Sequence, residues 1–185
     1  MLRQLKNAFL LLLFLSITTG LLYPLLITGL SQWWFADKAN GQIRSHGSIL
    51  LGQYFNRPDY FWGRPSATSP FPNNGAASSG SNLAPSNPAL IKAMQDRADT
   101  LKKYTQSTQP IPIDLLTASG SGLDPDISPA AAYYQADRVA QYRKIPLLTV
   151  QKLIAAHTHN RLWGFLGEPT VNVLLLNESL DAPKS

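Results

Sequence analysis

The chain has 185 residues, which points to one domain with at most a short appendage. Charged residues make up 15% of it, against roughly 25% in an ordinary soluble domain, and residues 7–36 contain no Asp, Glu, Lys or Arg. The remainder, residues 37–185, carries 14 basic and 11 acidic side chains, a net charge of +3 that is too weak to indicate a nucleic-acid-binding protein. Because the sequence has no cysteine, disulfide frameworks, thiolate metal sites and cysteine nucleophiles are excluded.

A long apolar segment, Ala8–Leu30, predicts a membrane-spanning helix. Its 23 uncharged residues would rise about 34 Å as a helix, enough to cross a hydrocarbon core of roughly 30 Å. Aromatic residues at 33–35 follow, where an interfacial belt belongs. A cleaved signal peptide is the alternative, but its apolar region is shorter and ends at a small-x-small site, which Trp34 prevents here. We therefore expect residues 1–36 to stay attached as an anchor and residues 37–185 to form the domain.

The cations on either side of the apolar segment set its expected orientation. Arg3 and Lys6 precede the segment, and Lys38 and Arg44 follow it closely. The positive-inside rule then gives a slight bias toward a cytoplasmic N-terminus. A single span in that orientation places the domain outside the cytoplasm.

One face of the predicted span carries small residues. Ser16 and Gly20 are four positions apart, so they share a helix face on which another helix can approach closely. Tyr23 and Pro24 continue this face, and membrane helices tolerate the kink that a proline introduces. The alternative is that a single small-residue pair occurs in the anchor by chance.

After the anchor, the apolar pattern and the chain breakers predict one mixed α/β domain. Of the 26 residues in 63–88, 18 are Gly, Pro, Ser or Asn, and the apolar anchors Phe71 and Leu83 favour an ordered surface loop over a flexible linker. Asn-Pro at 87–88 and Ser-Pro at 128–129 supply N-cap and first-turn signals for two helices. The expected elements are a strand beginning in 48–54, a helix from Pro88, a strand at 113–117, a helix from Pro129 to about Lys144, a helix at 150–159 capped by Thr149, and a buried strand at 170–176.

The sequence lacks the signatures of ATP hydrolysis and of ion conduction. No aspartate lies in an Asp-Lys-Thr-Gly context, and no phosphate-binding Gly-x-x-x-x-Gly-Lys-Ser/Thr loop is present. The Gly-x-Gly pair at 120–122 does not extend to Gly-x-Gly-x-x-Gly because Pro125 occupies the last place. A potassium filter of the Thr-Val-Gly-Tyr-Gly type is also missing. We expect the chain by itself neither to hydrolyse ATP by a known motif nor to conduct ions.

Two groups of residues match metal sites only in part. Asp124, Asp126 and Ser128 alternate as in a calcium loop, but Pro129 and Gln135 stand where that loop needs Gly and an acid. A turn and a helix cap are therefore the favoured interpretation. His157 and His159 diverge by about 200° on a helix, which makes them poor joint ligands of a metal.

A hydrolase is the remaining catalytic alternative. It would use Ser121, one of the two histidines at 157 and 159, and Asp124, without the Gly-x-Ser-x-Gly or Ser-x-x-Lys pattern. Because such triads are recognised by geometry, a stand-alone membrane-anchored hydrolase or binding protein stays open as the alternative function.

Four longer stretches occur in a characteristic order. They are Tyr-Phe-Trp-Gly-Arg-Pro-Ser at 60–66, Ser-Gly-Ser-Asn-Leu-Ala-Pro-Ser-Asn-Pro at 79–88, Thr-Ala-Ser-Gly-Ser-Gly-Leu-Asp-Pro-Asp-Ile-Ser-Pro-Ala-Ala at 117–131, and Gly-Glu-Pro-Thr-Val-Asn-Val-Leu at 167–174. With the N-terminal span, they resemble the C subunit of the bacterial potassium-importing P-type ATPase, the KdpC family, over nearly the whole chain. The family often has Gly where Ser79 and Ala84 stand and His where Asp126 stands, which puts in doubt any role that needs an imidazole there.

The resemblance implies a non-catalytic subunit of a four-subunit complex in the bacterial inner membrane. Its implied partners are a channel-like subunit that moves potassium, a P-type subunit that hydrolyses ATP and a very small hydrophobic subunit, besides membrane lipid and without nucleic acid. We expect no cofactor of its own, and ATP only through the complex. The family is commonly described as a catalytic chaperone that raises ATP affinity. For an extracytoplasmic domain, that effect would be a coupling through membrane helices.

We expect the partner-facing surface to combine the small-residue face of the anchor with two segments of the domain, Tyr60–Ser66 and Ser119–Asp124. If so, replacing Arg64 by Ala should weaken co-purification of the complex; the alternative is a structural arginine that holds loop carbonyls. The expected residues are Ser16, Gly20, Tyr60, Gly63, Arg64, Ser119, Gly120, Ser121 and Asp124.

Overall fold

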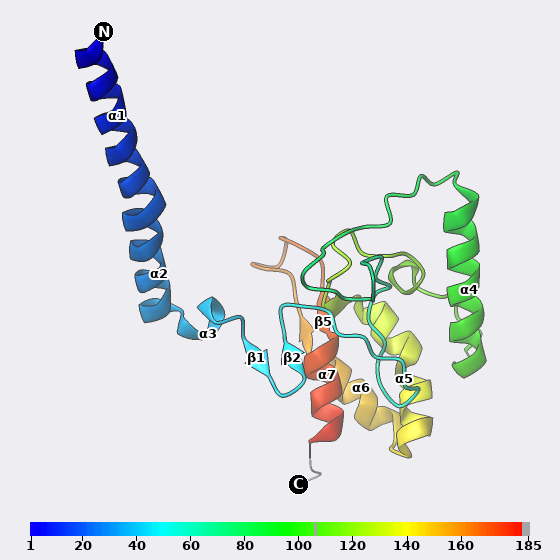
Figure 1. Ribbon diagram of the computed structural model, residues 1–185. Coiled ribbons are helices and arrows are strands. Elements are labelled where there is room, and N and C mark those ends of the chain that lie inside the picture. Colours follow the sequence, from blue (N-terminus) through cyan, green and yellow to red (C-terminus); the bar gives the residue numbers. More distant parts are fainter. Residues whose placement is uncertain (106, 183–185) are drawn as a thin grey trace. The chain divides into compact units, whose positions relative to one another are not determined.

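The computed structural model describes residues 1–105 and 107–182, and the chain divides into two units, Met1–Ile43 and the residues from Arg44 onward. Among the described residues, Leu2–Trp34 is the one helix that is long and apolar enough to cross a membrane, with a mean hydropathy of 2.2 in its most apolar window. This confirms the expected N-terminal apolar helix. Along the chain, the first unit contains α1 (Leu2–Ile17), a π-helical turn (Thr18–Leu22), α2 (Tyr23–Trp34) and α3 (Ala36–Ala39) (Figure 1).

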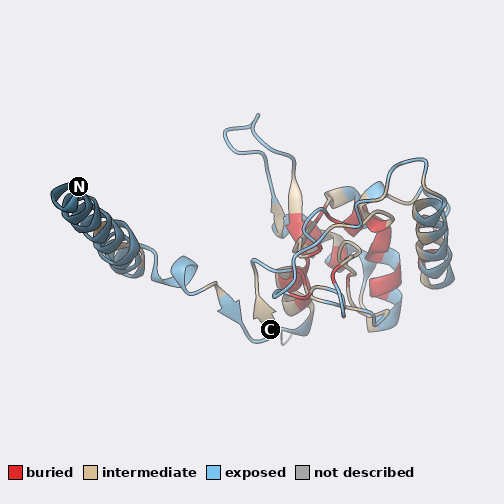
Figure 2. Cartoon of the chain, turned by 45° about the horizontal axis from the view of Figure 1, so that its top comes forward, coloured by how far each residue is buried: buried red, intermediate tan, exposed pale blue. Residues whose placement is uncertain are grey.

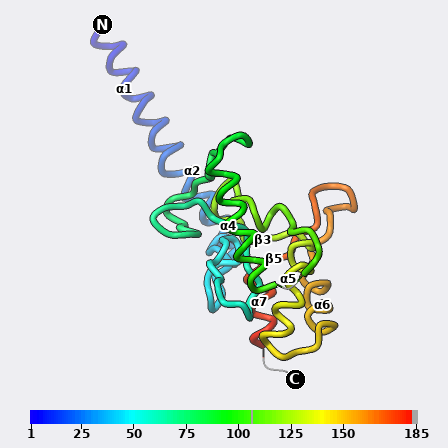
Figure 3. The backbone as a smooth tube through the Cα atoms, turned by 90° about the vertical axis from the view of Figure 1, so that its right-hand side faces the viewer, coloured from blue at the N-terminus to red at the C-terminus, as the bar shows by residue number. Residues whose placement is uncertain are grey.

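The second unit is a mixed helix-and-sheet domain, as predicted. Helices α5, α6 and α7 pack around a small antiparallel sheet whose strand order is β3-β5-β4 (Figures 1 and 3). In the central strand, Val171 lies opposite Ile127 on one side and Thr158 on the other. The elements after α3 are β1 (Ile43–Arg44), β2 (Gly47–Ser48), α4 (Pro88–Tyr104), a 3-10 turn (Ile113–Leu115), β3 (Asp126–Ile127), α5 (Pro129–Arg143), α6 (Leu147–Ala156), β4 (Thr158–His159), β5 (Thr170–Asn172) and α7 (Val173–Asp181).

The two predicted helix starts are confirmed by their capping hydrogen bonds. The Asn87 side chain accepts from the backbone N–H of Ala89 at 2.9 Å, and the Ser128 hydroxyl accepts from that of Ala131 at 3.0 Å. In both helices proline occupies the first position, where its missing N–H costs nothing. Helix α5 ends before Lys144, which adopts a left-handed conformation with φ 55°.

Several predicted elements are wrong. Residues 113–117 form a 3-10 turn, not a strand, and α6 begins at Leu147 after Pro146, so Thr149 is not its cap. The apolar run 170–176 is a strand only as far as Asn172. There the Asn172 side chain accepts from the backbone N–H of Leu175 and starts α7, so the following aliphatic residues are helical. A short apolar run does not distinguish a buried strand from a buried helix.

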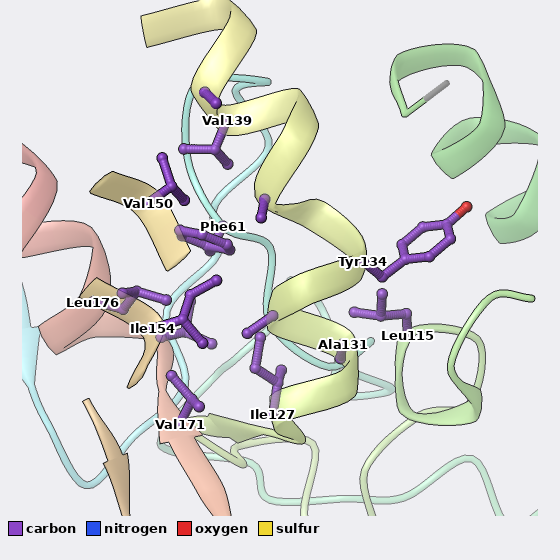
Figure 4. Packing of buried hydrophobic residues seen from close by; sticks show 14 of the residues in the cluster. Phe61, Leu115, Ile127, Ala131, Tyr134, Val139, Val150, Ile154, Val171 and Leu176 are labelled. Atoms are coloured by element: carbon purple, nitrogen blue, oxygen red, sulfur yellow. The ribbon is translucent and has the colours of Figure 1, made fainter. Parts of the chain in front are cut away.

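Helix α5 forms the centre of the core and is buried on two sides. On one side lie Phe61, Val150 and Ile154, and on the other the helix's own Tyr134 extends beside Leu115 (Figure 4). Figure 2 shows buried residues gathered in and around this helix, whereas the helix of the first unit is exposed. The small alanine side chains of α5 allow its neighbours to approach closely.

Candidate functional site

Residues 60–62, the start of the predicted partner-facing segment Tyr60–Ser66, are held inside the domain by side-chain amides. The side chain of Asn177 accepts from the N–H of Phe61 at 2.8 Å and donates to its carbonyl at 3.0 Å. Gln135 does the same for Trp62, at 2.8 and 3.1 Å. These amides take the place of strand partners, because residues 61 and 62 form no strand of their own. Residues 60–62 are therefore fixed between α5 and α7.

A buried arginine reinforces this arrangement. Arg138 is 1% exposed, and its guanidinium donates to the carbonyl of Pro58 at 2.8 Å and to the side chain of Gln135 at 2.6 Å. It also lies 4.2 Å from the centre of the Trp62 ring, a cation–π contact. Burial lowers the pKa of Arg138 to about 10, so this group is still a cation at neutral pH.

Tyr60 belongs to the same internal network. Its hydroxyl donates to the Asp181 carboxylate at 2.8 Å, and Arg143 lies 4.5 Å from the centre of its ring while pairing with Asp181 at 2.7 Å. The hydrogen bond to Asp181, together with burial, raises the pKa of Tyr60. A partner-facing Tyr60 stays a prediction, and the contacts described here give the residue a role within the domain.

Arg64 and Asp124, predicted from separate parts of the sequence, lie together. The Arg64 guanidinium donates to the Asp124 carboxylate at 3.0 Å, and the second carboxylate oxygen accepts from the backbone N–H of Asp126 at 3.1 Å. The two side chains are 28% and 31% exposed, so the pair lies at the edge of the domain surface. It joins the two segments expected to face partners.

Hydrogen bonds to backbone carbonyls also join these two segments, Tyr60–Ser66 and Ser119–Asp124. The N–H of Ser119 donates to the carbonyl of Pro65 at 3.0 Å, and the Ser66 hydroxyl donates to the carbonyl of Gly122 at 2.7 Å. The N–H of Ser79 donates to the carbonyl of Ser121 at 2.9 Å. These bonds confirm that 63–88 is an ordered loop.

The residues of the second loop differ in exposure. Ser119 is buried, whereas Gly120 and Ser121 are exposed. Gly122 has φ 68°, and a Cβ at that position would lie 2.6 Å from the carbonyl oxygen of Ser79. Gly63 has more room, since a Cβ there would come no closer than 3.9 Å to Val173. The loop thus combines a fixed base with an exposed Gly-Ser surface.

A groove of about 590 Å³ borders the Arg64 side chain. Trp62 and Tyr104 meet edge to face in its wall, with ring centres 5.6 Å apart. Arg97 donates to the carbonyl of Leu116 at 2.6 Å, and burial lowers its pKa. The groove has aromatic and cationic walls and is completed by Gln53, Tyr54, Phe55, Asn56, Gly63, Pro65, Ser66, Pro72, Asn73, Ala93, Asp96, Thr100, Leu101 and Leu115.

The residues that a hydrolase would use as a catalytic triad each contact a different partner. The hydroxyl of Ser121 accepts from the N–H of Leu123, Asp124 pairs with Arg64, and Nδ1 of His157 lies 2.9 Å from the carbonyl oxygen of Leu153. Within the described ranges, no hydrogen bond joins Ser121 or Asp124 to a histidine. No cluster of three or more His, Asp or Glu that could hold a metal ion is found in the described part of the chain.

In the first unit, the predicted helix face is open. Ser16 and Gly20 are exposed, and a Cβ at Gly20 would meet nothing within 4 Å. The π-helical turn Thr18–Leu22 directly precedes the turn of Pro24. Such a local widening accommodates a residue that lacks an N–H. The face therefore keeps room for a neighbouring helix.

The sequence analysis did not predict the structural role of three buried polar residues: Gln135, Arg138 and Asn177. Gln135 and Arg138 are three positions apart on one helix and lie among alanines and Val139. Polar side chains within such an apolar stretch are the signal that could have revealed them, because buried polar groups need internal partners. They hold the 58–62 segment in place.

Comparisons with known proteins identify the family. Residues 5–182 match the model of the family described as KdpC, the c chain of the K+-transporting ATPase. The chain is 54% identical over 173 residues to the potassium-transporting ATPase KdpC subunit of Polynucleobacter asymbioticus, covering 90% of this chain and 92% of that protein. It is 52% identical to the proteins of that name from Methylococcus capsulatus and Sorangium cellulosum, covering 98% and 100% of this chain and 99% and 100% of those proteins. The chain therefore belongs to the KdpC family of potassium-transporting ATPase subunits.

Proposed function

We propose that this chain is a non-catalytic accessory subunit that is needed to assemble and stabilise the ATP-driven potassium importer. The observation that carries the proposal is the family match over residues 5–182, together with relatives that are named as subunits of a potassium-transporting ATPase. A subunit without nucleotide or ion-conduction motifs contributes to transport through its contacts with other subunits. Its partners in this proposal are the channel-like subunit, the P-type subunit and the small hydrophobic subunit.

In this proposal the apolar helix anchors the chain once in the bacterial inner membrane, with a cytoplasmic N-terminus. Support comes from its 33 residues and from the open face around Ser16 and Gly20. Small residues on that face allow close packing against a helix of another subunit. The domain that follows would then lie on the extracytoplasmic side.

We further propose that the domain contacts its partners through the surface around Arg64 and Asp124 and through the exposed residues Gly120 and Ser121. The supporting observation is that this surface is fixed from beneath by ionic and backbone hydrogen bonds between two loops. A fixed surface loses little conformational entropy on binding, which favours docking.

An effect on ATP affinity would be indirect in this arrangement. An extracytoplasmic domain does not reach cytoplasmic nucleotide, so the chain would bias the equilibrium between states of the P-type subunit through the membrane helices. Coupling free energies between distant sites are typically about 1–3 kcal/mol, enough for a change of roughly 5–150-fold in affinity. The assembly role and the nucleotide effect are thus two consequences of one set of contacts.

Co-expression tests the assembly role. The partner subunits are expressed with and without this chain, extracted in mild detergent and separated by size, and potassium uptake is measured in the same cells. We expect a stable complex and uptake only when the chain is present. Partners that assemble and transport equally well without it would refute the proposal.

A further inference from the structure

The connection between β4 and β5 ends in an apolar tip, residues 161–168, that holds four large apolar side chains in solvent. Trp163 and Phe165 are 77% and 71% exposed, and Leu162 and Leu166 are 60% and 46% exposed. The two aromatic rings lie 6.4 Å apart and so form one surface. The tip, orange in Figures 1 and 3, projects from the domain. Exposed apolar side chains that gather in this way mark an interaction surface.

The backbone of the apolar tip is fixed by its own hydrogen bonds. The N–H of Leu162 donates to the carbonyl of Leu166 at 2.8 Å, and the N–H of Phe165 donates to the carbonyl of Leu162 at 3.3 Å. The N–H of Gly164 also donates to the carbonyl of Arg161, at 3.1 Å. The apolar side chains are therefore presented in a set geometry, which lowers the entropy lost on docking.

The conformation of Trp163 is unfavourable for that residue. Its φ is 53° and that of Gly164 is 84°, the pair of positive values that a type I′ turn requires. Such turns prefer Asn-Gly, whereas a bulky side chain with positive φ is an outlier. Local turn stability thus favours asparagine over tryptophan here. The turn itself therefore does not account for a tryptophan at this position.

The surroundings of the tip favour a protein partner over lipid. Arg161 donates to both carboxylate oxygens of Glu168, at 2.9 and 2.7 Å, which neutralises the cation at the base of the tip. A loop that binds anionic lipid headgroups would offer unpaired cations to their phosphate groups. An apolar centre with a neutral polar rim is instead the anatomy of a protein interface.

We propose that the apolar tip docks into an apolar pocket on another subunit of the potassium-transporting ATPase, with Trp163 and Phe165 as its anchors. This inference rests on the proposed function, because it names the surface through which the accessory subunit meets a partner. Exposed Trp and Phe side chains that enter a preformed pocket carry a large share of the binding energy of an interface.

Cross-linking within the assembled complex tests the proposal. Phe165 is replaced by the photoreactive amino acid benzoylphenylalanine in the full-length chain, and Tyr142, an exposed aromatic residue of α5, is replaced in the same way to set the background. After illumination we expect an adduct between position 165 and one partner subunit, well above that background. Adducts with lipid alone, or no adduct above the background, would overturn the proposal.

The variant Trp163→Asn keeps the inference falsifiable by a second route. Because asparagine suits the turn, the variant should unfold at the same or a higher denaturant concentration, while the recovered complex falls several-fold. Full recovery of the complex would overturn the inference, and the proposed function would stand if omitting the whole chain still abolished assembly. Assembly without the chain would instead mean that the proposed function itself fails.

Discussion

The clearest structural prediction concerns Asn177, which bonds both polar groups of the Phe61 backbone. Leucine has the same branched arrangement of side-chain heavy atoms as asparagine, with bulkier methyl groups, so Asn177→Leu leaves no cavity but removes the acceptor at 2.8 Å and the donor at 3.0 Å. An unsatisfied buried group costs about 1–3 kcal/mol, so losing partners for two groups should lower the free energy of unfolding by about 2–6 kcal/mol. That loss is a large fraction of the roughly 5–15 kcal/mol that stabilises an ordinary domain.

The assay for Asn177→Leu is denaturant unfolding of the full-length chain in detergent micelles, followed by near-UV circular dichroism. The matched control is Asn56→Leu, since Asn56 is exposed and such a change normally stays within about 0.5 kcal/mol. If both variants lost the same small amount of stability, the two hydrogen bonds between the Asn177 side chain and the Phe61 backbone would not stabilise the domain. The variant Asn177→Asp adds a pH test. Its loss of unfolding free energy relative to wild type should shrink as the pH falls, because protonation of the new carboxylate restores a donor toward the Phe61 carbonyl.

Three further predictions concern the loops and the aromatic segment. Gly122→Ala should destabilise the domain by about 1–3 kcal/mol because of its left-handed φ and the close carbonyl of Ser79, whereas Gly120→Ala, with open space around its Cβ, should be nearly neutral; equal thermal shifts would contradict this. A double-mutant cycle of Arg64→Ala and Asp124→Ala should give a coupling free energy of about 0.2–1 kcal/mol, as expected for a partly exposed ion pair. Arg64→Ala should also weaken co-purification of the complex, whereas Lys92→Ala, in an exposed ion pair, serves as the control. The absence of coupling together with full co-purification would contradict both roles of Arg64. Because the pKa of Tyr60 is raised, the stabilisation from its hydroxyl is fully present below the ordinary pKa of 10.0 and is lost as the pH rises through the raised pKa. The difference in unfolding free energy between wild type and Tyr60→Phe should therefore shrink above pH 10. A difference that stays constant would refute the contact with Asp181.

Local signals in the sequence predicted the parts of the fold that depend on few residues. Asn87 and Ser128 cap helices because their side chains satisfy N–H groups two or three positions away, an interaction that a short sequence pattern encodes. The anchor follows from its length and composition alone. In contrast, the run 170–176 was predicted wrongly because Asn172 was not recognised as the cap of a helix that begins at Val173.

Individual residues of the candidate site could be predicted from the sequence, but the contacts between them could not. Arg64 and Asp124 were both singled out, but their pairing depends on a fold that brings residues 60 positions apart together. Asn177 and Phe61 are 116 positions apart, and no local pattern predicts a bond over that distance. The apolar tip escaped attention because exposure is a property of the folded domain.

The side of the membrane on which the domain lies decides between docking with indirect coupling and direct contact with nucleotide. The chain has no cysteine, so a single Gln141→Cys on an exposed position of α5 can be probed with a membrane-impermeant maleimide, after the outer membrane is permeabilised and while the inner membrane stays sealed. Gln4→Cys, before the apolar segment, is the matched control. We predict labelling of Gln141→Cys in sealed cells and of Gln4→Cys only after lysis. Protection of Gln141→Cys until the inner membrane is lysed would contradict an extracytoplasmic docking role.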